Sequence, residues 1–342
     1  MVSPDERYSR QILLPTLGGG GQARIRAARV VVMGCGGLGS NAAAMLARAG
    51  VGGLRLVDRD VVELSNLHRQ ALYDEADVVQ ALPKAVAAAR HLAAINSEVE
   101  VEAIVADATP ESIRKLIADA DVVVDGFDNF EGRYLLNDAC VERRVPWIYG
   151  ACVETSGVVA ALVPGRTPCL RCLFPQPPAA GSSPTCDTAG IIGPAANAAA
   201  AFQVAQALRV LTGELPDAAV LVSFDVWSGS SERIEVARAA LVGPCPCCDK
   251  RHFEFLAAST AGASVLCGRD AVMVRPFASG RPDLAAIADR LCGFGSIVAN
   301  EFLVRATVTG GEVTVFTDGR VLVKGTADPA VARSLVSRFV GV

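Results

Sequence analysis

Two closely spaced cysteine pairs are the residues of this chain whose spacing most directly suggests a chemistry. The first pair is Cys169 and Cys172, and the second is Cys245 and Cys248. A C-x-x-C pair presents two thiolates to one ion, and two such pairs complete the tetrahedral ligand set of a structural zinc site. The alternative is two unrelated pairs of buried thiols, or a redox pair. Cys247 is a further thiol inside the second pair and leaves the ligand assignment there open.

Polar and charged side chains that follow a short apolar run form a second candidate site. They are Asp58, Asp60, Asn66, Arg69 and Gln70. Lys84 and Asp128 are expected near the same place. A lysine and an arginine can neutralise a triphosphate, and an aspartate can hold Mg²⁺. Each of these residues alone is typical of a solvated surface, but the ordered set favours a site for a phosphorylated ligand.

A glycine-rich turn at residues 34–39 indicates how such a ligand would be held. Gly34, Gly36 and Gly39 have the spacing G-x-G-x-x-G. The first glycine permits a tight turn, the second lets a phosphate approach the backbone, and the third lets the following helix pack on the strand. That helix directs its free N–H groups and its positive dipole end at the anion. Asp58 ends the next apolar run, where a ribose-binding carboxylate belongs. The motif does not decide which nucleotide binds.

Extended and helical segments alternate around these residues, and this alternation predicts an α/β fold. The extended segments are 28–33, 54–57, 99–104, 121–125, 147–151, 158–162 and 219–225, and the helical ones are 40–49, 83–92, 111–118, 133–143 and 197–211. This order indicates a Rossmann-like, doubly wound and mostly parallel sheet with right-handed crossovers. The polar loops then lie at the carboxyl edge of the sheet, where ligands bind in open α/β folds.

An irregular segment at residues 164–194 is rich in Pro, Gly and Ser and contains Cys186. It is too long to be an idle connection in a compact domain. A cysteine in an exposed loop suits a nucleophile or a persulfide acceptor. An inert loop cysteine is the alternative.

The C-terminal part of the chain reads as a separate, smaller unit. We expect a first domain at 1–255, a linker at 256–264 and a small α+β domain at 265–342. Its predicted elements are 271–275, 283–291, 297–308, a hairpin at 312–325 with a turn at Asp318–Gly319, and 329–338. Cys267 and Cys292 are expected to pack inside this domain. Its role is binding of a partner protein, extension of a dimer or passive stabilisation.

Composition excludes several classes of partner. The formal net charge is −4, and 51% of the residues are hydrophobic. This balance predicts neither nucleic-acid nor membrane binding. No apolar run reaches the roughly twenty residues that span a bilayer, and the polar N-terminus lacks the apolar core of a signal peptide. We therefore expect a cytoplasmic protein whose 11 cysteines are metal ligands, a nucleophile and buried thiols rather than a disulfide framework.

The motifs occur together in one order that is known from a family. They are Arg7-Tyr-Ser-Arg10, the glycine turn, Asp58-Arg-Asp60, Asn66-Leu-His-Arg69-Gln70, Pro83-Lys84, Asp128-Asn129 and the two C-x-x-C pairs. This order closely resembles the MoeB/ThiF/HesA family of adenylating enzymes, bacterial relatives of ubiquitin-activating enzymes. Rossmann dehydrogenases carry neither the asparagine–arginine loop nor the paired cysteines.

The resemblance implies ATP-dependent adenylation of the C-terminal Gly-Gly carboxylate of a small ubiquitin-like, MoaD- or ThiS-type sulfur-carrier protein. The products would be an acyl-adenylate and pyrophosphate, for later sulfur transfer in molybdopterin, thiamine, thiolated-tRNA or cysteine synthesis. The implied ATP-contacting residues are Gly36, Gly37, Gly39, Asp58, Asp60, Asn66, Arg69, Gln70, Lys84, Asp128 and Asn129. Asp58 would bind the ribose, Asp128 would bind Mg²⁺, and Arg69 and Lys84 would act on the phosphates. Arg10 would enter the partner's site across a homodimer interface.

Cys186 matches the position of a reactive cysteine in this family. In some members it forms a thioester or an acyl-disulfide with the carrier, and in others it is dispensable. A sulfurtransferase or a cysteine desulfurase is the further partner that this chemistry implies. Arg133 follows the expected magnesium loop and either orients the carrier tail or is a solvated charge. Residues 265–342 show no rhodanese-like active-site loop.

Three alternative functions remain beside adenylation of a carrier protein. An NAD-dependent oxidoreductase is allowed by the glycine turn but lacks a hydride-site His/Lys set. An adenylating dehydratase that acts on a modified tRNA base is disfavoured because the chain has no basic stripe. A scaffold that binds nucleotide without turnover is disfavoured by the full set of phosphate-contacting residues.

Overall fold

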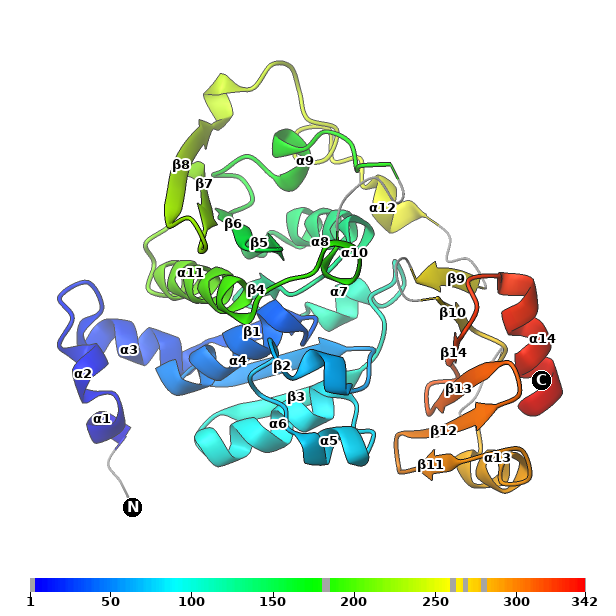
Figure 1. Ribbon diagram of the computed structural model, residues 1–342. Helices are drawn as coiled ribbons and strands as arrows, with labels where there is room; N and C mark the ends of the chain where they lie inside the picture. Colours follow the sequence, from blue (N-terminus) through cyan, green and yellow to red (C-terminus); the bar gives the residue numbers. More distant parts are fainter. Residues whose placement is uncertain (1–3, 180–184, 259–262, 267–269, 278–281, 342) are drawn as a thin grey trace. The chain divides into compact units, whose positions relative to one another are not determined.

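The computed structural model describes residues 4–179, 185–258, 263–266, 270–277 and 282–341 (Figure 1). The chain divides into two compact units. The first comprises residues 1–75 and 83–258, and the second comprises 76–82 and 259–342. The short segment 76–82 therefore groups with the C-terminal residues, although it precedes them by much of the chain. Each unit is described here by itself.

The first unit is built on an eight-stranded sheet with the order β3-β2-β1-β4-β5-β6-β7-β8. The strands are β1 (Arg29–Met33), β2 (Gly53–Asp58), β3 (Glu100–Val105), β4 (Val122–Asp125), β5 (Trp147–Val153), β6 (Ser156–Leu162), β7 (Ala218–Asp225) and β8 (Ser230–Ala237). Strands β1 to β5 pair in parallel, and β6 to β8 continue the sheet in antiparallel pairs. The Rossmann-like α/β prediction is confirmed.

Helices cover both faces of this sheet (Figure 1). The longer ones are α3 (Gly18–Ala27), α4 (Gly37–Ala49), α6 (Lys84–Ile95), α8 (Phe130–Arg143) and α11 (Gly193–Leu211). Short helices are α1 (Pro4–Arg7), α2 (Ser9–Ile12), η1 (Leu64–Asn66), α7 (Ile113–Leu116), α9 (Leu170–Leu173), α10 (Cys186–Ala189), η2 (Arg238–Ala240) and α12 (Glu254–Ala257). The short helix α5 (Glu75–Val79) falls almost entirely in the second unit. Among the described residues, no helix is both long and apolar enough to cross a membrane.

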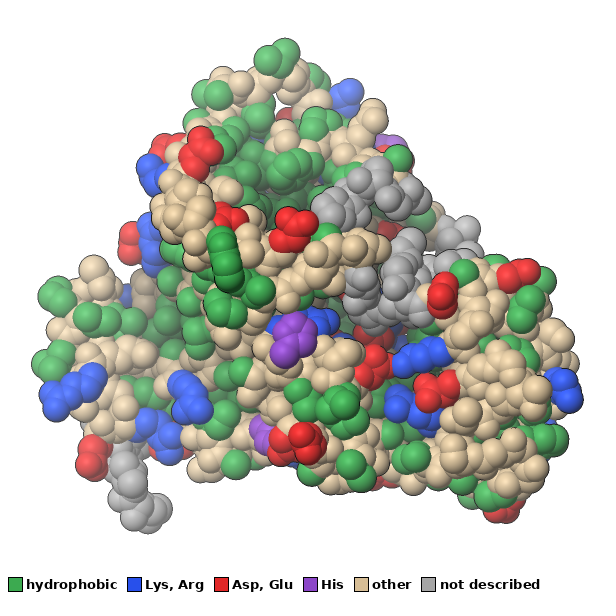
Figure 2. All heavy atoms as spheres, viewed as in Figure 1, with side chains coloured by type: hydrophobic (Ala, Val, Ile, Leu, Met, Phe, Trp, Pro, Cys, Tyr) green, Lys and Arg blue, Asp and Glu red, His purple; other side chains and the backbone are tan. Residues whose placement is uncertain are grey.

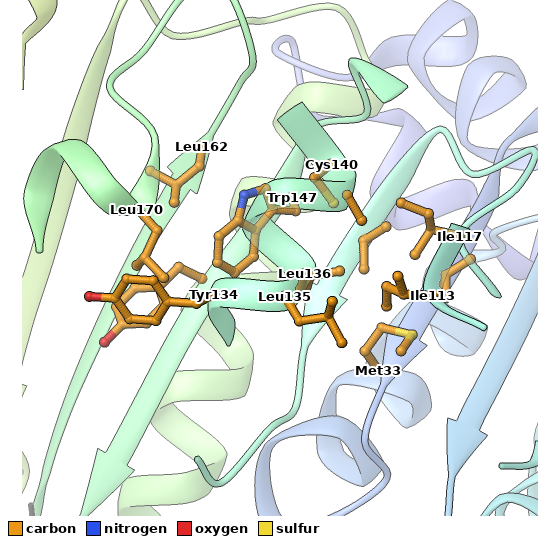
Figure 3. Close-up of a cluster of buried hydrophobic side chains, with 14 of the residues drawn as sticks. Met33, Ile113, Ile117, Tyr134, Leu135, Leu136, Cys140, Trp147, Leu162 and Leu170 are labelled. Carbon is orange, nitrogen blue, oxygen red and sulfur yellow. The ribbon is translucent and has the colours of Figure 1, made fainter. Parts of the chain in front are cut away.

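The central strands are apolar on both sides because helices cover both sides. Val30, Val31 and Val32 on β1 have no exposed surface. One side of the sheet packs in a cluster with Trp147 of β5 and Leu136 of α8, which Figure 3 shows among side chains of α7 and α9. This rigid core fixes where the strands end, and the candidate site lies at those ends.

The C-terminal unit holds a six-stranded antiparallel sheet with the order β11-β12-β13-β14-β10-β9. Its elements are β9 (Ala263–Leu266), β10 (Ala271–Val274), α13 (Leu284–Leu291), β11 (Ile297–Ala299), β12 (Leu303–Val308), β13 (Gly311–Phe316), β14 (Val321–Lys324) and α14 (Pro329–Phe339). Valines of the sheet and Phe339 of α14 share one buried cluster. The second unit thus has a core of its own.

Three sequence expectations about the C-terminal unit can be compared with the structure. The turn at Asp318–Gly319 is confirmed, because Gly319 has φ +84° and joins β13 to β14. The single strand expected at 297–308 is wrong. Asn300 Oδ1 accepts the N–H groups of Phe302 and Leu303, and this turn separates β11 from β12. Cys292 is exposed rather than packed inside, and Cys267 lies outside the described residues.

Candidate active site

The glycine turn connects β1 to α4. Two of its glycines are required because neighbouring backbone lies too close for a side chain. Gly34 has φ +94°, and a Cβ there would lie 2.5 Å from the carbonyl oxygen of Gly126. A Cβ at Gly39 would lie 1.7 Å from the carbonyl oxygen of Gly34. These two positions must lack a side chain if β1, α4 and the residues after β4 are to approach this closely.

Gly36 differs from these two glycines because the protein itself leaves room beside it. The nearest atom to a Cβ built at Gly36 is Gln70 Nε2, at 3.9 Å. Gly36 is the N-cap of α4, so the open space faces the unpaired N–H groups of a long helix. A backbone that is accessible at a helix N-terminus is suited to an anion.

This difference predicts opposite outcomes for two alanine substitutions. Gly39→Ala should destabilise the fold, because the new Cβ collides with backbone. Gly36→Ala should leave the melting temperature unchanged, because the space beside Gly36 is open, but should weaken binding of ATP, the ligand that the resemblance implies, by about tenfold or more. Thermal melting and nucleotide titration of both variants check this prediction. An unfolded Gly36→Ala, or one with full affinity for ATP, would contradict it.

Asp58 lies at the end of β2 and is held against the glycine turn. Its Oδ2 accepts the N–H of Cys35 at 2.6 Å, and its Oδ1 accepts the N–H of Asp60 at 2.6 Å. Burial raises the pKa of the Asp58 carboxyl, while the cation of Lys84 opposes that shift. The carboxylate is therefore fixed in position, and each oxygen keeps a lone pair for a hydroxyl donor.

Lys84 places a buried cation next to this carboxylate pair. Its side chain is only 6% exposed, and Nζ lies 3.4 Å from Asp60 Oδ2. The Lys84 N–H also donates to the carbonyl oxygen of Asp60 at 2.9 Å. Lys84 is the first residue of α6, where the helix dipole disfavours a cation. The carboxylates of Asp58 and Asp60 balance this buried cation, which therefore lies at the same sheet edge as the glycine turn.

The loop at 64–70 brings amide and guanidinium groups to the first turn of α4. Arg69 Nη1 donates to the carbonyl oxygen of Ser65 at 2.8 Å, and Asn41 Nδ2 of α4 donates to the Arg69 carbonyl oxygen at 3.0 Å. A Cβ at Gly37 would lie 3.7 Å from the Arg69 methylenes. Asn66 is buried, and its Oδ1 accepts the Glu63 N–H at 3.2 Å.

Gln70 has a buried polar atom that points to a missing partner. Its Oε1 has no hydrogen-bond partner among the residues that the structure describes. An unpaired buried oxygen of this kind is costly unless a ligand or water satisfies it. Because the Gln70 amide is also the nearest group to Gly36, the residues around the open space fit a polar ligand.

The loop after β4 carries Asp128 and is anchored by a buried ion pair that the sequence did not reveal. Arg133 Nε lies 3.1 Å from Asp125 Oδ2, and Arg133 Nη2 donates to the carbonyl oxygens of Phe127 and Gly150. Of the two alternatives for Arg133, the solvated charge is wrong, because the side chain is buried, and orientation of the carrier tail stays a prediction. Burial raises the pKa of Asp125 against the effect of the Arg133 cation. The pair holds the loop, and Asp128 is exposed on it.

Asn129 and Arg10 have different surroundings. Asn129 Oδ1 caps α8 by accepting the Gly132 N–H at 2.8 Å, and its Nδ2 donates to Asp128 Oδ1 at 2.9 Å. Arg10 is exposed on α2. Within the described part of the chain, no hydrogen bond or ion pair joins the Arg10 side chain to the other predicted residues. Its role therefore stays a prediction.

The four predicted zinc ligands lie together in the structure. Sγ–Sγ distances are 3.8 Å for Cys169–Cys172, 3.7 Å for Cys169–Cys245 and 3.4 Å for Cys172–Cys248. All four sulfurs are within 4.8 Å of one another. A tetrahedral ion with Zn–S bonds of about 2.3 Å requires sulfurs about 3.8 Å apart. The donor set and its dimensions fit zinc.

Cys247 is not part of this group. It is fully buried, and its sulfur accepts a hydrogen bond from Asn137 Nδ2 at 3.3 Å. Arg238 Nη1 instead donates to Cys248 Sγ at 3.2 Å, which stabilises negative charge on that sulfur. Cys248 is therefore the candidate ligand, and Cys247 packs behind it.

Charged side chains are interspersed on the face of the protein drawn in Figure 2. The described residues there show acidic and basic groups in turn rather than a basic stripe. This distribution agrees with the small net charge of −4.

The sequence and the structure of this chain are similar to those of known proteins. The model of the ThiF family matches residues 8–247. A "sulfur carrier protein ThiS adenylyltransferase" of Bacillus subtilis is 46% identical over 338 residues, which cover 98% of this chain and 99% of that protein. A "sulfur carrier protein adenylyltransferase" of Thermus thermophilus is 41% identical over 71% of this chain and 90% of its own length. The crystal structure of Escherichia coli MccB with ATP superposes with a TM-score of 0.62 and 25% identity, covering 71% of this chain and 75% of that one. The chain belongs to the ThiF family.

Proposed function

We propose that this protein is an adenylyltransferase that activates the C-terminal carboxylate of a small sulfur-carrier protein with ATP. One observation carries the proposal: three groups lie together at one edge of the sheet. They are the accessible N-terminus of α4 at Gly36, the fixed carboxylate of Asp58 and the buried cation of Lys84. The relatives named above support the carrier protein as the acceptor.

The reaction places two anions against each other. A carboxylate oxygen attacks the α-phosphorus of ATP, and the bond from that phosphorus to the oxygen bridging to the β-phosphate breaks. The electron pair leaves with pyrophosphate, and the product is an acyl-adenylate. Cationic donors must stabilise the charge that gathers on the phosphates, and precise placement of the two reactants supplies much of the remaining rate.

The residues of the site suit separate parts of ATP. The two fixed oxygens of Asp58 suit the ribose hydroxyls, and the accessible N–H groups at Gly36 and Gly37 suit a phosphate. Lys84 and Arg69 are the cations for the phosphates, with Asn66 and Gln70 as neutral donors. The carboxamide of Gln70 also offers an acceptor, because its Oε1 lacks a partner among the described residues.

Asp128 is the residue proposed to hold Mg²⁺. Its carboxylate is exposed at the end of a parallel strand, on a loop that the Asp125–Arg133 pair fixes. Mg²⁺ favours one or two carboxylates together with substrate phosphate oxygens, so a single exposed aspartate fits. When bound, the ion would neutralise phosphate charge. Asp60, paired with Lys84, and Asn129, beside Asp128, would position these groups.

A zinc ion held by the four cysteines would have a structural role. Four thiolates close the coordination shell and leave no position for substrate. The ion would tie the short helix α9 to the segment 245–248. This tie would fix the start of the segment 174–194 that carries Cys186.

The partners follow from the same proposal. The substrate is a small ubiquitin-like protein of the ThiS or MoaD type that ends in Gly-Gly, as the family resemblance implies and as the ThiS adenylyltransferase relative supports. A homodimer would deliver Arg10 to the partner's site. A sulfurtransferase or cysteine desulfurase would supply sulfur after adenylation.

Pyrophosphate exchange tests this function. Labelled pyrophosphate should enter ATP only when the protein is given both Mg²⁺ and a carrier that ends in Gly-Gly. The same carrier without its last glycine is the matched control and should support no exchange. Exchange that is independent of any carrier would overturn the proposal.

Substitution of Cys186 should distinguish adenylation of the carrier from the later covalent transfer step. Cys186→Ala should retain pyrophosphate exchange within about twofold of the wild-type rate, because the thiol is not needed for attack on the phosphorus. The variant should form no covalent enzyme–carrier adduct on a non-reducing gel. Loss of exchange itself in a folded Cys186→Ala would show that this order of steps is wrong.

A further inference from the structure

Cys152 and Cys186 bring two thiols together at the end of β5. The Cys186 thiol donates to the carbonyl oxygen of Cys152, with Sγ 3.5 Å from that oxygen, and its proximity raises the pKa of the Cys152 thiol. Both residues are partly exposed. Neither belongs to the four-cysteine group, so this is a second and separate pair of sulfurs.

Backbone hydrogen bonds hold the two cysteines at this distance. The N–H of Glu154, just after β5, donates to the carbonyl oxygen of Gly190 at 2.8 Å, and the N–H of Ile192 donates back to the Glu154 carbonyl oxygen at 3.0 Å. Thr185 caps α10 by accepting the Thr188 N–H. The segment that carries Cys186 is therefore hydrogen-bonded to the end of β5 just after α10.

We infer that Cys152 and Cys186 form a reversible dithiol–disulfide pair, in which Cys186 accepts a sulfur-bonded group and Cys152 displaces it. The ligand class is any group R–S that is joined to Cys186 through a sulfur–sulfur bond. The inference rests on the proposed function, in which Cys186 takes part in sulfur transfer. It adds Cys152 as the second thiol that releases the group bound to Cys186.

The chemistry balances with a disulfide as the oxidant. The Cys186 thiolate attacks one sulfur of R–S–S–R, the bond between those sulfurs breaks, and R–S⁻ leaves with its electron pair. The Cys152 thiolate then attacks Cys186 Sγ, and the second R–S⁻ leaves. Two protein thiols are oxidised to one disulfide, one R–S–S–R is reduced to two R–S⁻, and two protons go to solvent. An external dithiol restores the starting state.

The electrostatics favour Cys152 as the thiol that reacts second. The neighbouring Cys186 thiol and burial both raise the pKa of Cys152, while the guanidinium groups of Arg133 and Arg69 oppose them. When Cys186 is converted to a mixed disulfide, its thiol no longer acts on Cys152. The pKa of Cys152 then falls, and the thiolate forms next to the bond that it attacks.

The test uses the full chain without ATP or carrier, with 5,5′-dithiobis(2-nitrobenzoate) as the aromatic disulfide. In the wild type, the pair should release about two thionitrobenzoate anions. Non-reducing peptide mapping should show a Cys152–Cys186 crosslink and no label left on Cys186. Cys152→Ser should release about one anion from this site and keep the label on Cys186. Cys292→Ser removes an exposed thiol elsewhere, so it should release about one anion fewer in total but form the same Cys152–Cys186 crosslink.

Two outcomes decide the inference. A stable label on Cys186 in the wild type, equal to that in Cys152→Ser and without a crosslink, overturns it. If the serine variant melts early, Cys152→Ala repeats the measurement and must also retain the label. Because neither nucleotide nor carrier is present, this result stands or falls separately from adenylation.

Discussion

Asp128→Ala should lower carrier-dependent pyrophosphate exchange by about a thousandfold or more. Asp128 is the exposed carboxylate proposed to hold Mg²⁺, and without the ion the phosphate charge stays unneutralised as the carboxylate approaches. The fold should be unaffected, because Asp128 is exposed and the Asp125–Arg133 pair anchors its loop. Initial exchange rates at saturating Mg²⁺, together with thermal melting, measure both effects.

Glu131→Ala is the matched control for Asp128. Glu131 is an exposed acid three positions further along, in the first turn of α8. Its loss removes a similar charge from the same end of the helix, and we expect exchange within about twofold of the wild type. A folded Asp128→Ala with normal exchange would remove this residue from the mechanism. An equal loss in both variants would point to general electrostatics instead.

Cys172→Ser should lose its zinc and melt at a clearly lower temperature. A structural site contributes the free energy of metal binding to folding, so the loss should amount to several kcal/mol, or about 5 °C or more. Metal analysis of the purified protein should give about one zinc per chain for the wild type and far less for the variant. Calorimetry or circular dichroism gives the melting temperature.

Cys247→Ser separates loss of a ligand from loss of a buried thiol. Cys247 is buried beside the group, but Asn137 hydrogen-bonds its sulfur and it lies outside the four ligands. This variant should keep its zinc even if it loses some stability. Full zinc content and unchanged melting in Cys172→Ser would refute the assignment of the four ligands.

The parts of the site that depend on local backbone geometry could be predicted from the sequence. The spacing of Gly34, Gly36 and Gly39 specifies a strand, a turn and a helix, and Asp58 follows at the end of the next strand. The two C-x-x-C pairs likewise predict two turns whose thiols can meet around one ion, and the four sulfurs do lie together. What remained open was whether Cys247 or Cys248 faces the first pair, and only the three-dimensional arrangement answers that.

Features that depend on tertiary contacts could not be predicted. The Asp125–Arg133 ion pair joins a strand end to the next helix, and a lone arginine on a helix is usually solvated. Cys152 could not be paired with Cys186 from the sequence, because the two approach each other only through the hydrogen bond between Glu154 and Ile192, which holds the segment with Cys186 against β5. Strand β8 was missed because nearly all of its residues are exposed, and only Ile234 and Val236 alternate with polar residues, which is too short a pattern to predict a strand.

If the proposed function is right, this protein transfers the AMP moiety of ATP to the C-terminal carboxylate of a carrier and releases pyrophosphate. The direct measurement is intact-mass analysis of a panel of small proteins that end in Gly-Gly, each incubated with the enzyme, ATP and Mg²⁺. We expect at least one carrier to gain the mass of one AMP, and hydroxylamine to remove that AMP. The proposed adenylation is contradicted if no carrier in the panel gains AMP although the same preparation binds ATP.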